Sequence, residues 1–257
     1  MLLAVPFGLA IGLALGMLGG GGSILVVPVL AYVLGQDAQE ATTASLVIVT
    51  FAAIAGGAGQ ARHGNVCWRH AGLFTAAALP GIVAGTVAGD AVSGRLLLAV
   101  FGGVMLIAAY ATARKQTPRA SAGSGERCPG LRLGRDIGFG ALVGFLTGFL
   151  GVGGGFVIVP ALALALRFPM HSAIGTSLAV ITATGVLGSA AHFAAGRTID
   201  ADVTIAMTAA MVIGALAGAR LGQSISERAL AQGFAALVSA VAVYLIVSSA
   251  FFGGPPG

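Results

Sequence analysis

Long stretches without a charged side chain constrain this chain more than any other feature. Eight such stretches are separated by groups of charged residues: Met1–Gln36, Ala41–Ala61, His70–Gly89, Leu96–Ala113, Ile137–Leu166, Phe168–Gly196, Val203–Ala219 and Ala229–Gly257. Charged residues make up 8% of the chain, against roughly 25% in soluble domains. Because a helix needs about 20 apolar residues to cross a bilayer, the pattern predicts an all-α polytopic membrane protein with eight membrane-embedded segments. It excludes a water-soluble enzyme.

Positive charge is concentrated between the fourth and fifth segments, where Arg114–Arg135 holds six of the thirteen basic residues. We therefore predict three regions: a first transmembrane repeat at 1–113, a basic cytoplasmic linker at 114–135 and a second transmembrane repeat at 136–257. A basic loop beside membrane spans faces anionic lipid, so we assign the net charge of +5 to contact with the lipid bilayer and predict no nucleic-acid partner. We expect a multi-pass protein of the cytoplasmic (inner) membrane, and homo-oligomerisation is left open.

The two halves of the chain are copies of one another. Gly16–Ser23 aligns with Gly148–Gly155 at an offset of 132 residues, and Val27-Pro28 and Ser45-Leu46 find matches at the same offset. The first and fifth segments are longer than one span requires, and both contain a run of glycines. Each interior glycine costs a helix about 1 kcal/mol relative to alanine, so we expect a break in each. Interrupted segments at matching positions of two repeats are typical of secondary transporters.

Two topologies are compatible with this repeat. If all eight segments cross the membrane, the repeats are parallel, and Arg95, Arg167, Arg220 and Arg228 lie outside when the linker is inside. If the two broken segments enter and return on the same side, the repeats are inverted, and only Arg95 and Arg197 lie outside. The positive-inside rule favours the inverted repeat.

The glycine breaks are the best candidates for a binding site. A helix that restarts after a break presents free backbone N–H groups and the positive end of its dipole, which suit an anion. Small hydroxyl side chains on the second and sixth segments could complete such a site, although they often bond only their own helix. The predicted substrate-binding residues are Gly21, Gly22, Ser23, Ser45, Gly153, Gly154, Gly155, Thr176 and Ser177. The alternative is close helix packing without a ligand.

Two further polar residues, Gln60 and His192, align with each other in the repeat. We predict a gating or proton-linked role for them, and the alternative for His192 is an ordinary interface histidine. Gly81, Gly85, Gly214 and Gly218 are spaced for helix contact.

Signatures of catalysis are missing from the sequence. It contains no G-x-S-x-G or HExxH motif and no pair of carboxylates within a segment, so we predict no catalytic residue, no cofactor and no metal. Cys67 and Cys128 are the two cysteines. Because both fall in regions that we place in the cytoplasm, we expect reduced thiols rather than a disulfide.

The motif G-x-L-G-x-G-G-x(4)-V-P, present at Gly16–Pro28 and Gly148–Pro160, resembles the signature of the sulfite exporter TauE/SafE family. Ala173–Leu178 and the Ala191–Gly196 segment around His192 resemble further parts of that family. The resemblance implies a permease for small anions, often sulfite or organosulfonates such as sulfoacetate. The first half departs from the pattern, since Ala41–Ser45 lacks the glycine and Gln60 replaces the histidine.

We therefore predict a secondary transporter, an exporter of small sulfur-containing anions, with its site near the midplane where the glycine breaks meet. One alternative is a membrane-embedded protein that relays sulfur through Cys67. The other is an accessory subunit that transports nothing.

Overall fold

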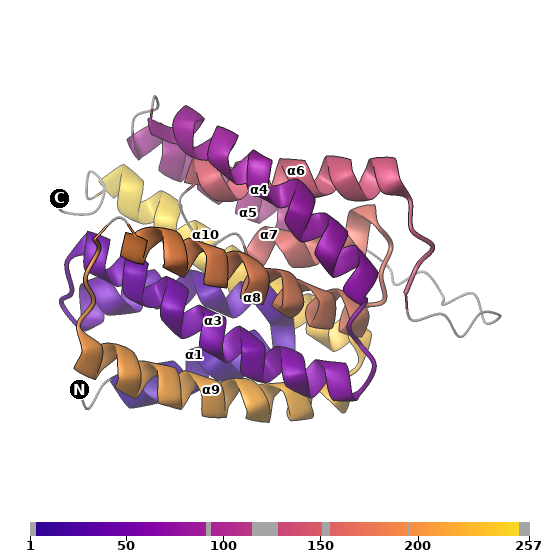
Figure 1. The fold of residues 1–257 in the computed structure, drawn as a ribbon, viewed down its shortest axis with the longest axis horizontal. Helices are drawn as coiled ribbons and strands as arrows, with labels where there is room; N and C mark the ends of the chain where they lie inside the picture. Colours follow the sequence, from indigo (N-terminus) through magenta and orange to yellow (C-terminus); the bar gives the residue numbers. More distant parts are fainter. Residues whose placement is uncertain (1–3, 91–93, 115–127, 151–154, 195, 252–257) are drawn as a thin grey trace.

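The computed structural model describes residues 4–90, 94–114, 128–150, 155–194 and 196–251. This part of the chain is helical and contains no strand (Figure 1). Five of its helical stretches are long and apolar enough to cross a membrane: Ala4–Ala31, Gln39–Arg62, Trp68–Ala88, Met170–Ala194 and Ala201–Gln223. An all-helical polytopic membrane protein is thereby confirmed, whereas the count of eight membrane-embedded segments stays a prediction.

The first segment breaks and turns back, as its glycines predict. Helix α1 (Ala4–Leu18) ends at Gly19, whose φ of +71° is rarely adopted by residues with a side chain. The chain continues as a 3₁₀ helix, η1 (Gly19–Leu25), and then α2 (Val26–Pro28). A Cβ placed on Gly22 would lie 2.6 Å from the backbone nitrogen of Leu15, whereas residues seven apart on a straight helix are about 10 Å apart. The segment therefore folds back against α1.

The fifth segment has the same plan. Helix α6 (Leu133–Leu150) is followed by α7 (Gly155–Pro160). In both halves a short π-helix follows the proline: η2 (Val29–Val33) and η3 (Ala161–Ala165). Proline has no N–H to donate within the helix, and at each site the hydrogen-bond ladder lengthens to five residues directly after it. The shared local structure supports the sequence repeat.

The remaining helices are long: α3 (Ala38–Arg62), α4 (Trp68–Asp90), α5 (Gly94–Arg114), α8 (Met170–Ala194), α9 (Ala201–Gln223) and α10 (Glu227–Phe251). The principal pairs each join one half of the chain to the other. Helix α1 packs against α9, α6 against α4, α3 against α8 and α5 against α10 (Figure 1). The two halves are therefore interleaved rather than side by side.

Glycines bring the α1–α9 and α4–α6 pairs into backbone contact. A Cβ on Gly214 would lie 2.8 Å from the backbone nitrogen of Leu13, and one on Gly81 would lie 2.8 Å from that of Phe145. Gly85 and Gly218 meet the same helices one turn further along. The predicted packing role of these glycines is confirmed.

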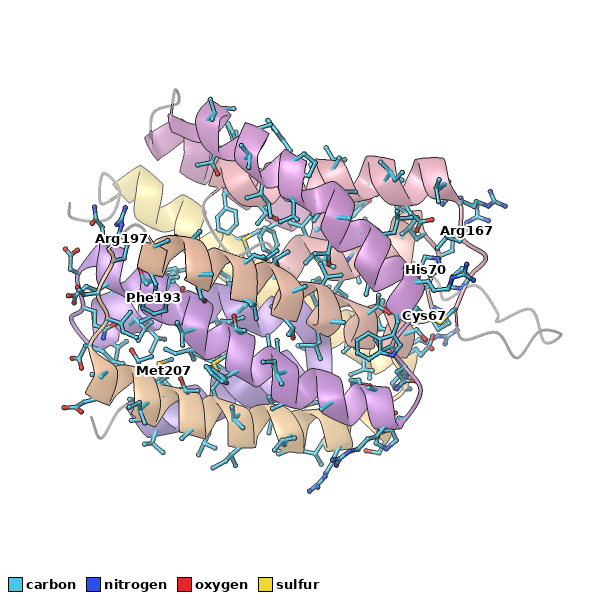
Figure 2. All side chains as sticks on the ribbon, viewed as in Figure 1. Cys67, His70, Arg167, Phe193, Arg197 and Met207 are labelled. Atoms are coloured by element: carbon cyan, nitrogen blue, oxygen red, sulfur yellow. A yellow bond between two sulfur atoms is a disulfide. The ribbon has the colours of Figure 1, made fainter. Side chains whose placement is uncertain are left out.

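Charge differs between the two ends of the bundle. Figure 2 places Arg167, His70 and Cys67 at one end, and Arg197 and Phe193 at the other. We call the first the basic end; the helix termini bring to it Arg62, Arg69, Arg132, Arg135, Arg167, Arg220 and Arg228, together with Asp136 and Glu227. The acidic end holds Asp37, Glu40, Asp200 and Asp202 with Arg197. Helix α1 begins at the acidic end, and α6, its counterpart in the repeat, begins at the basic end.

The expectation of two reduced thiols is wrong for this structure. Cys67 and Cys128 form a disulfide at the basic end, with their Cα atoms 5.8 Å apart. The chain returns to the start of α4 after the linker, and a sequence separation of 61 residues gives no local signal of that contact. Cys67 is 3% exposed, so a sulfur relay through this residue lacks the free thiol that it requires.

Candidate functional site

The two broken segments meet inside the bundle. A Cβ on Gly155, at the start of α7, would lie 2.8 Å from Ser23 Oγ and 3.1 Å from the Cα of Gly20 in η1. A Cβ on Gly19 would lie 2.8 Å from Ser177 Oγ of α8. There is no room for a side chain at these contacts, so glycine is required for the close approach.

A cavity of about 350 Å³ lies beside this junction. Its walls come from the first broken segment and from α3, α4, α6 and α8. Hydroxyl side chains are its main polar groups: Ser23, Thr42, Ser45, Thr50, Thr86, Thr147 and Thr184. His192 completes the polar lining, beside apolar residues such as Val49 and Ile181. None of the described lining residues is Asp, Glu, Lys or Arg.

Most of the cavity hydroxyls donate their proton to a carbonyl of their own segment. Ser45 Oγ donates to the carbonyl of Thr42 at 2.7 Å, and Thr147 Oγ1 donates to that of Val143 at 2.7 Å. Ser23, Thr50, Thr86 and Thr184 do the same. A hydroxyl has one proton and two lone pairs, so each can bond an anion only by rotating away from its carbonyl. That exchange costs an intramolecular bond worth about 1 kcal/mol net.

His192 is held in place by a hydrogen bond to α3. Its Nδ1 lies 3.0 Å from Thr43 Oγ1, and Thr43 Oγ1 donates its only proton to the carbonyl of Gln39 at 2.9 Å. The proton between the ring and Thr43 must therefore belong to Nδ1, which acts as the donor. This bond joins α8 to α3 at the acidic end and fixes the imidazole in the cavity wall.

Gln60, the repeat partner of His192, lies away from the cavity. It is 1% exposed, and its Oε1 accepts hydrogen bonds from Asn65 Nδ2 at 2.9 Å and from Gln223 Nε2 at 2.7 Å. Asn65 Nδ2 also lies 3.2 Å from Gln223 Oε1. We call these three residues the amide cluster; it links α3 to α9 near the basic end. Sequence reasoning missed Asn65 and Gln223, since nothing in their spacing connects them.

Four other predicted residues, Thr176, Ser177, Gly21 and Gly22, are not among the residues of the cavity lining. Thr176 Oγ1 accepts a hydrogen bond from the Cys67 N–H at 3.1 Å, and Ser177 donates to the Ile174 carbonyl at 2.8 Å. Gly21 packs against the ring of Phe234, and Gly22 packs against α1. Gly153 and Gly154 lie outside the described residues. Of the predicted substrate-binding residues, the cavity brings together Ser23 and Ser45, with Gly155 touching Ser23.

The sequence reasoning also missed Thr86, Thr147 and Thr184. The sequence did contain a signal for them. Each of these threonines occupies a position at which the other half of the repeat has an apolar residue. Their repeat partners, in the same order, are Ala219, Leu15 and Ala52.

The positions that correspond to these threonines in the other half of the repeat are apolar and closely packed. Leu15, Ala52 and Ala219 are all buried. A Cβ on Gly56 would lie 3.7 Å from the Cα of Gly16 and 3.7 Å from Ala215 Cβ, which are ordinary packing distances. The described cavity thus lies in one of the two repeat-related regions, and three threonines of its lining have buried apolar counterparts in the other.

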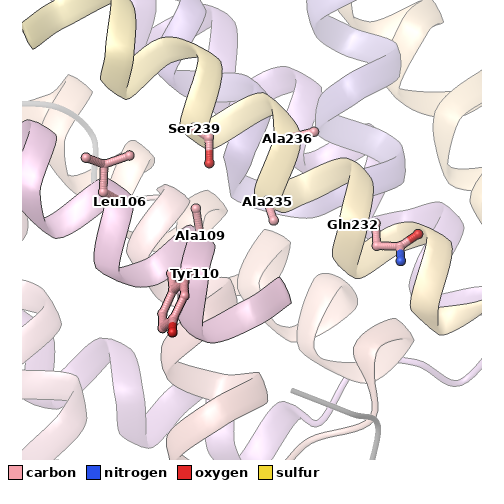
Figure 3. Close-up of a pocket in the computed structure, with 7 residues that line it drawn as sticks. All are labelled: Leu106, Ala109, Tyr110, Gln232, Ala235, Ala236 and Ser239. Carbon is pink, nitrogen blue, oxygen red and sulfur yellow. The ribbon is translucent and has the colours of Figure 1, made fainter. Parts of the chain in front are cut away.

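A second hollow, of about 530 Å³, lies between α5 and α10 (Figure 3). It is lined by Leu106, Ala109, Tyr110, Gln232, Ala235, Ala236 and Ser239. None of the predicted site residues lies there, and its polar groups come from three separated positions (Figure 3). The cavity at the broken helices is therefore the candidate site.

Apolar helices long enough to span a bilayer, two interrupted segments that meet internally and a polar cavity beside them define a polytopic membrane transporter. Residues 4–245 match the sulfite exporter TauE/SafE family, and the chain belongs to this family. The resemblance seen in the sequence is thereby confirmed.

The relatives have the same general description. The chain is 34% identical over 253 residues to a probable membrane transporter protein of Xylella fastidiosa (strain 9a5c), covering 96% of this chain and 95% of the relative. It is 27% identical to the probable membrane transporter protein YunE of Bacillus subtilis, covering 87% and 88%. It is 24% identical to the probable membrane transporter protein MJ0441 of Methanocaldococcus jannaschii, covering 96% and 97%. No solved structure matches the chain.

Proposed function

We propose that this protein is a secondary transporter that exports small sulfur-containing anions, such as sulfite or organosulfonates, across the cytoplasmic membrane. The observation that carries the proposal is the cavity of about 350 Å³ at the meeting point of the broken segments, with seven hydroxyl side chains in its lining. Hydroxyl groups can donate hydrogen bonds to the oxygen atoms of such anions. The family name supports sulfite as the first substrate to test.

The positive-inside rule supports an orientation with the basic end in the cytoplasm, whereas the Cys67–Cys128 disulfide at that end is of a kind more common outside it. The first broken segment then enters and returns on the outer side and the second on the cytoplasmic side, so the two repeats are inverted. In this orientation the cavity faces outward, and the amide cluster closes the cytoplasmic end. Relative motion of the repeats would open that end and close the cavity, giving alternating access. Export from a negative-inside cell is downhill by about 2.3 kcal/mol per charge per 100 mV.

Purified protein in liposomes tests this function, with the flux of sulfite as the readout. Thr147→Val removes one cavity hydroxyl while keeping the shape of the side chain. We expect the rate at low sulfite to fall about tenfold or more, because a hydrogen bond to a charged group contributes roughly 1.5–3 kcal/mol. Thr208→Val on α9 is the matched control, since Thr208 bonds the Thr204 carbonyl at 2.6 Å and is not among the residues of the cavity lining.

Equal rates for the two variants would contradict the assignment of the cavity. The wild-type protein also decides between the proposal and an accessory subunit, which would move no anion by itself. A panel of sulfite, sulfoacetate, sulfate and thiosulfate identifies the preferred substrate.

A further inference from the structure

We propose that sulfite cleaves the Cys67–Cys128 disulfide and becomes attached to Cys128, so that this bond is a covalent sensor of the transported anion. The inference rests on the proposed function for the presence of sulfite at the basic end. It adds a modification site that is not part of the cavity lining. It follows from the exposure of the two cysteines, from their place in the fold and from the charge around them.

The two cysteines differ in their exposure to water. Cys67 is 3% exposed, whereas Cys128 is partly exposed. Which sulfur of a disulfide is attacked depends on access, and the nucleophile approaches from the side opposite the sulfur that leaves. An anion from solution therefore attacks Sγ of Cys128, and Sγ of Cys67 is the leaving atom.

Cys67 lies where a departing thiolate is stabilised. It directly precedes Trp68, the first residue of α4, and its carbonyl accepts a hydrogen bond from the Ala71 N–H at 2.9 Å. Cys67 is therefore the N-terminal cap of this helix. The positive end of the helix dipole stabilises a thiolate at such a position, and a better stabilised thiolate leaves a disulfide faster.

Positive charge around the disulfide favours the approach of an anion. Arg69 follows Cys67 by two residues, and Arg132 follows Cys128 by four. Both arginines are exposed, whereas Asp136, the acidic residue next along the chain, is buried. Exposed charges act in solution over about a Debye length, which is ~10 Å in 0.1 M salt. Because the attraction grows with the charge of the anion, the sulfite dianion is favoured over singly charged nucleophiles.

The reaction is a displacement that needs no further oxidant or reductant. The lone pair on the sulfur of sulfite forms a bond to Cys128 Sγ, the bond between the two Sγ atoms breaks, and its electron pair leaves on Cys67. Cys128 becomes an S-sulfonate, and the Cys67 thiolate takes up a proton from water. The sulfur of sulfite is oxidised and that of Cys67 is reduced.

The reaction is reversible, which suits a sensor. Attack by the Cys67 thiolate on Cys128 Sγ expels sulfite and restores the disulfide. Because the two sulfurs are held close together, this return is favoured, and the modification accumulates only at roughly millimolar sulfite or above. Cytoplasmic disulfides are typically transient and act in catalysis or sensing, and a bond that the substrate itself opens is of that kind.

Cleavage releases a loop that contacts both halves of the chain. The Cys67 N–H donates to Thr176 Oγ1 of α8 at 3.1 Å, and Asn65 in the same loop belongs to the amide cluster. The disulfide ties this loop to the segment that leads into α6. Its cleavage therefore removes a covalent restraint on the relative motion of the repeats, and transport should become faster.

Peptide mapping tests the site. The purified full-length protein in detergent is titrated with sulfite at mildly alkaline pH, where sulfite is mainly the dianion, and new thiols are then blocked with iodoacetamide. We expect the sulfonate on Cys128 and the iodoacetamide label on Cys67. Sulfate, which has the same charge but no lone pair on its sulfur, should leave the disulfide intact. Arg69→Gln should slow the cleavage about threefold in dilute buffer and less in high salt.

Flux in liposomes tests the sensing role. Blocked protein, which cannot restore the disulfide, should transport sulfoacetate about twofold or more faster than untreated protein, because a restraint on the motion has been removed. Cys128→Ser, which cannot form the bond, should have the same rate before and after this treatment. A sulfonate on Cys67, a disulfide that stays intact throughout the titration, or equal rates for blocked and untreated protein would overturn the inference and leave the proposed function intact. Absence of transport by every form would overturn the proposed function and the sensing role, whereas the peptide map decides the modification site separately.

Discussion

At the scale of single residues, the contact between Gly20 and Gly155 determines how the site is built. These two glycines bring the backbones of η1 and α7 together, and Ser23 Oγ lies beside them. The arrangement leaves the hydroxyl of Ser23 in the cavity wall while the backbones close the space behind it. Any side chain at this contact would separate the two halves.

Gly20→Ala should therefore be strongly destabilising, because its Cβ would lie 2.6 Å from the Cα of Gly155 and closer still to its carbonyl group. Overpacking usually costs about 1–3 kcal/mol, and we expect a loss at the upper end, since backbone atoms cannot rotate away. Thermal unfolding in detergent measures it. Gly72→Ala in α4, with nothing within 4 Å of its new Cβ, should be neutral or stabilising by up to about 1 kcal/mol. Equal melting temperatures for the two variants would refute the contact.

Ser23 and Ser45 could be predicted as site residues because they flank a glycine break or align in the repeat. The same evidence also selected Thr176 and Ser177 as substrate-binding residues, although neither is among the residues of the cavity lining. The repeat shows which residues correspond between the two halves. It does not show which of the two corresponding regions contains a cavity. The second copy has buried apolar residues, Leu15, Ala52 and Ala219, in place of three threonines of the cavity lining.

At the scale of helices, the amide cluster joins α3 to α9. Gln60 Oε1 accepts two hydrogen bonds inside the protein, and a buried donor without its acceptor costs about 1–3 kcal/mol. Gln60→Leu should lower the stability by roughly that amount for each of the two donors left behind. The melting temperature in detergent provides the measurement.

Gln36→Leu is the matched control for this change. The side-chain amide atoms of Gln36 are buried and find no hydrogen-bond partner in the described part of the chain. Its replacement by leucine should be neutral or stabilising, because no bond is lost. A larger loss for Gln36→Leu than for Gln60→Leu would show that the cluster does not hold α3 and α9 together.

The breaks in the first and fifth segments were predictable, because a glycine run and a following proline are both unfavourable in a continuous helix. The disulfide was not, since Cys67 and Cys128 come together only through the return of the chain to α4. The amide cluster was equally hidden, because Gln60 and Gln223 meet across 163 residues of sequence. Local signals predict breaks and helix faces, whereas contacts between distant segments depend on the fold.

At the scale of the whole molecule, the inverted topology predicts opposite sides for two arginines. Figure 2 shows Arg167 at the basic end and Arg197 at the acidic end. In a chain whose own cysteines are replaced by serine, we expect Arg197→Cys to react with a membrane-impermeant maleimide in intact cells. Arg167→Cys should react only after the membrane is opened. Labelling of both residues from the same side would exclude this arrangement.

The interleaved helices also have a consequence for biosynthesis. α1 packs against α9, and α4 packs against α6, so both early helices find their partners in the second half of the chain, and the partner of α1 comes near its end. When the ribosome has released only residues 1–113, the glycine-lined faces of α1 and α4 still lack the backbones that they are shaped to receive. The first half must therefore remain unfinished in the translocon or the surrounding lipid until α9 emerges, and the nascent chain acquires its final packing as a single event near the end of synthesis.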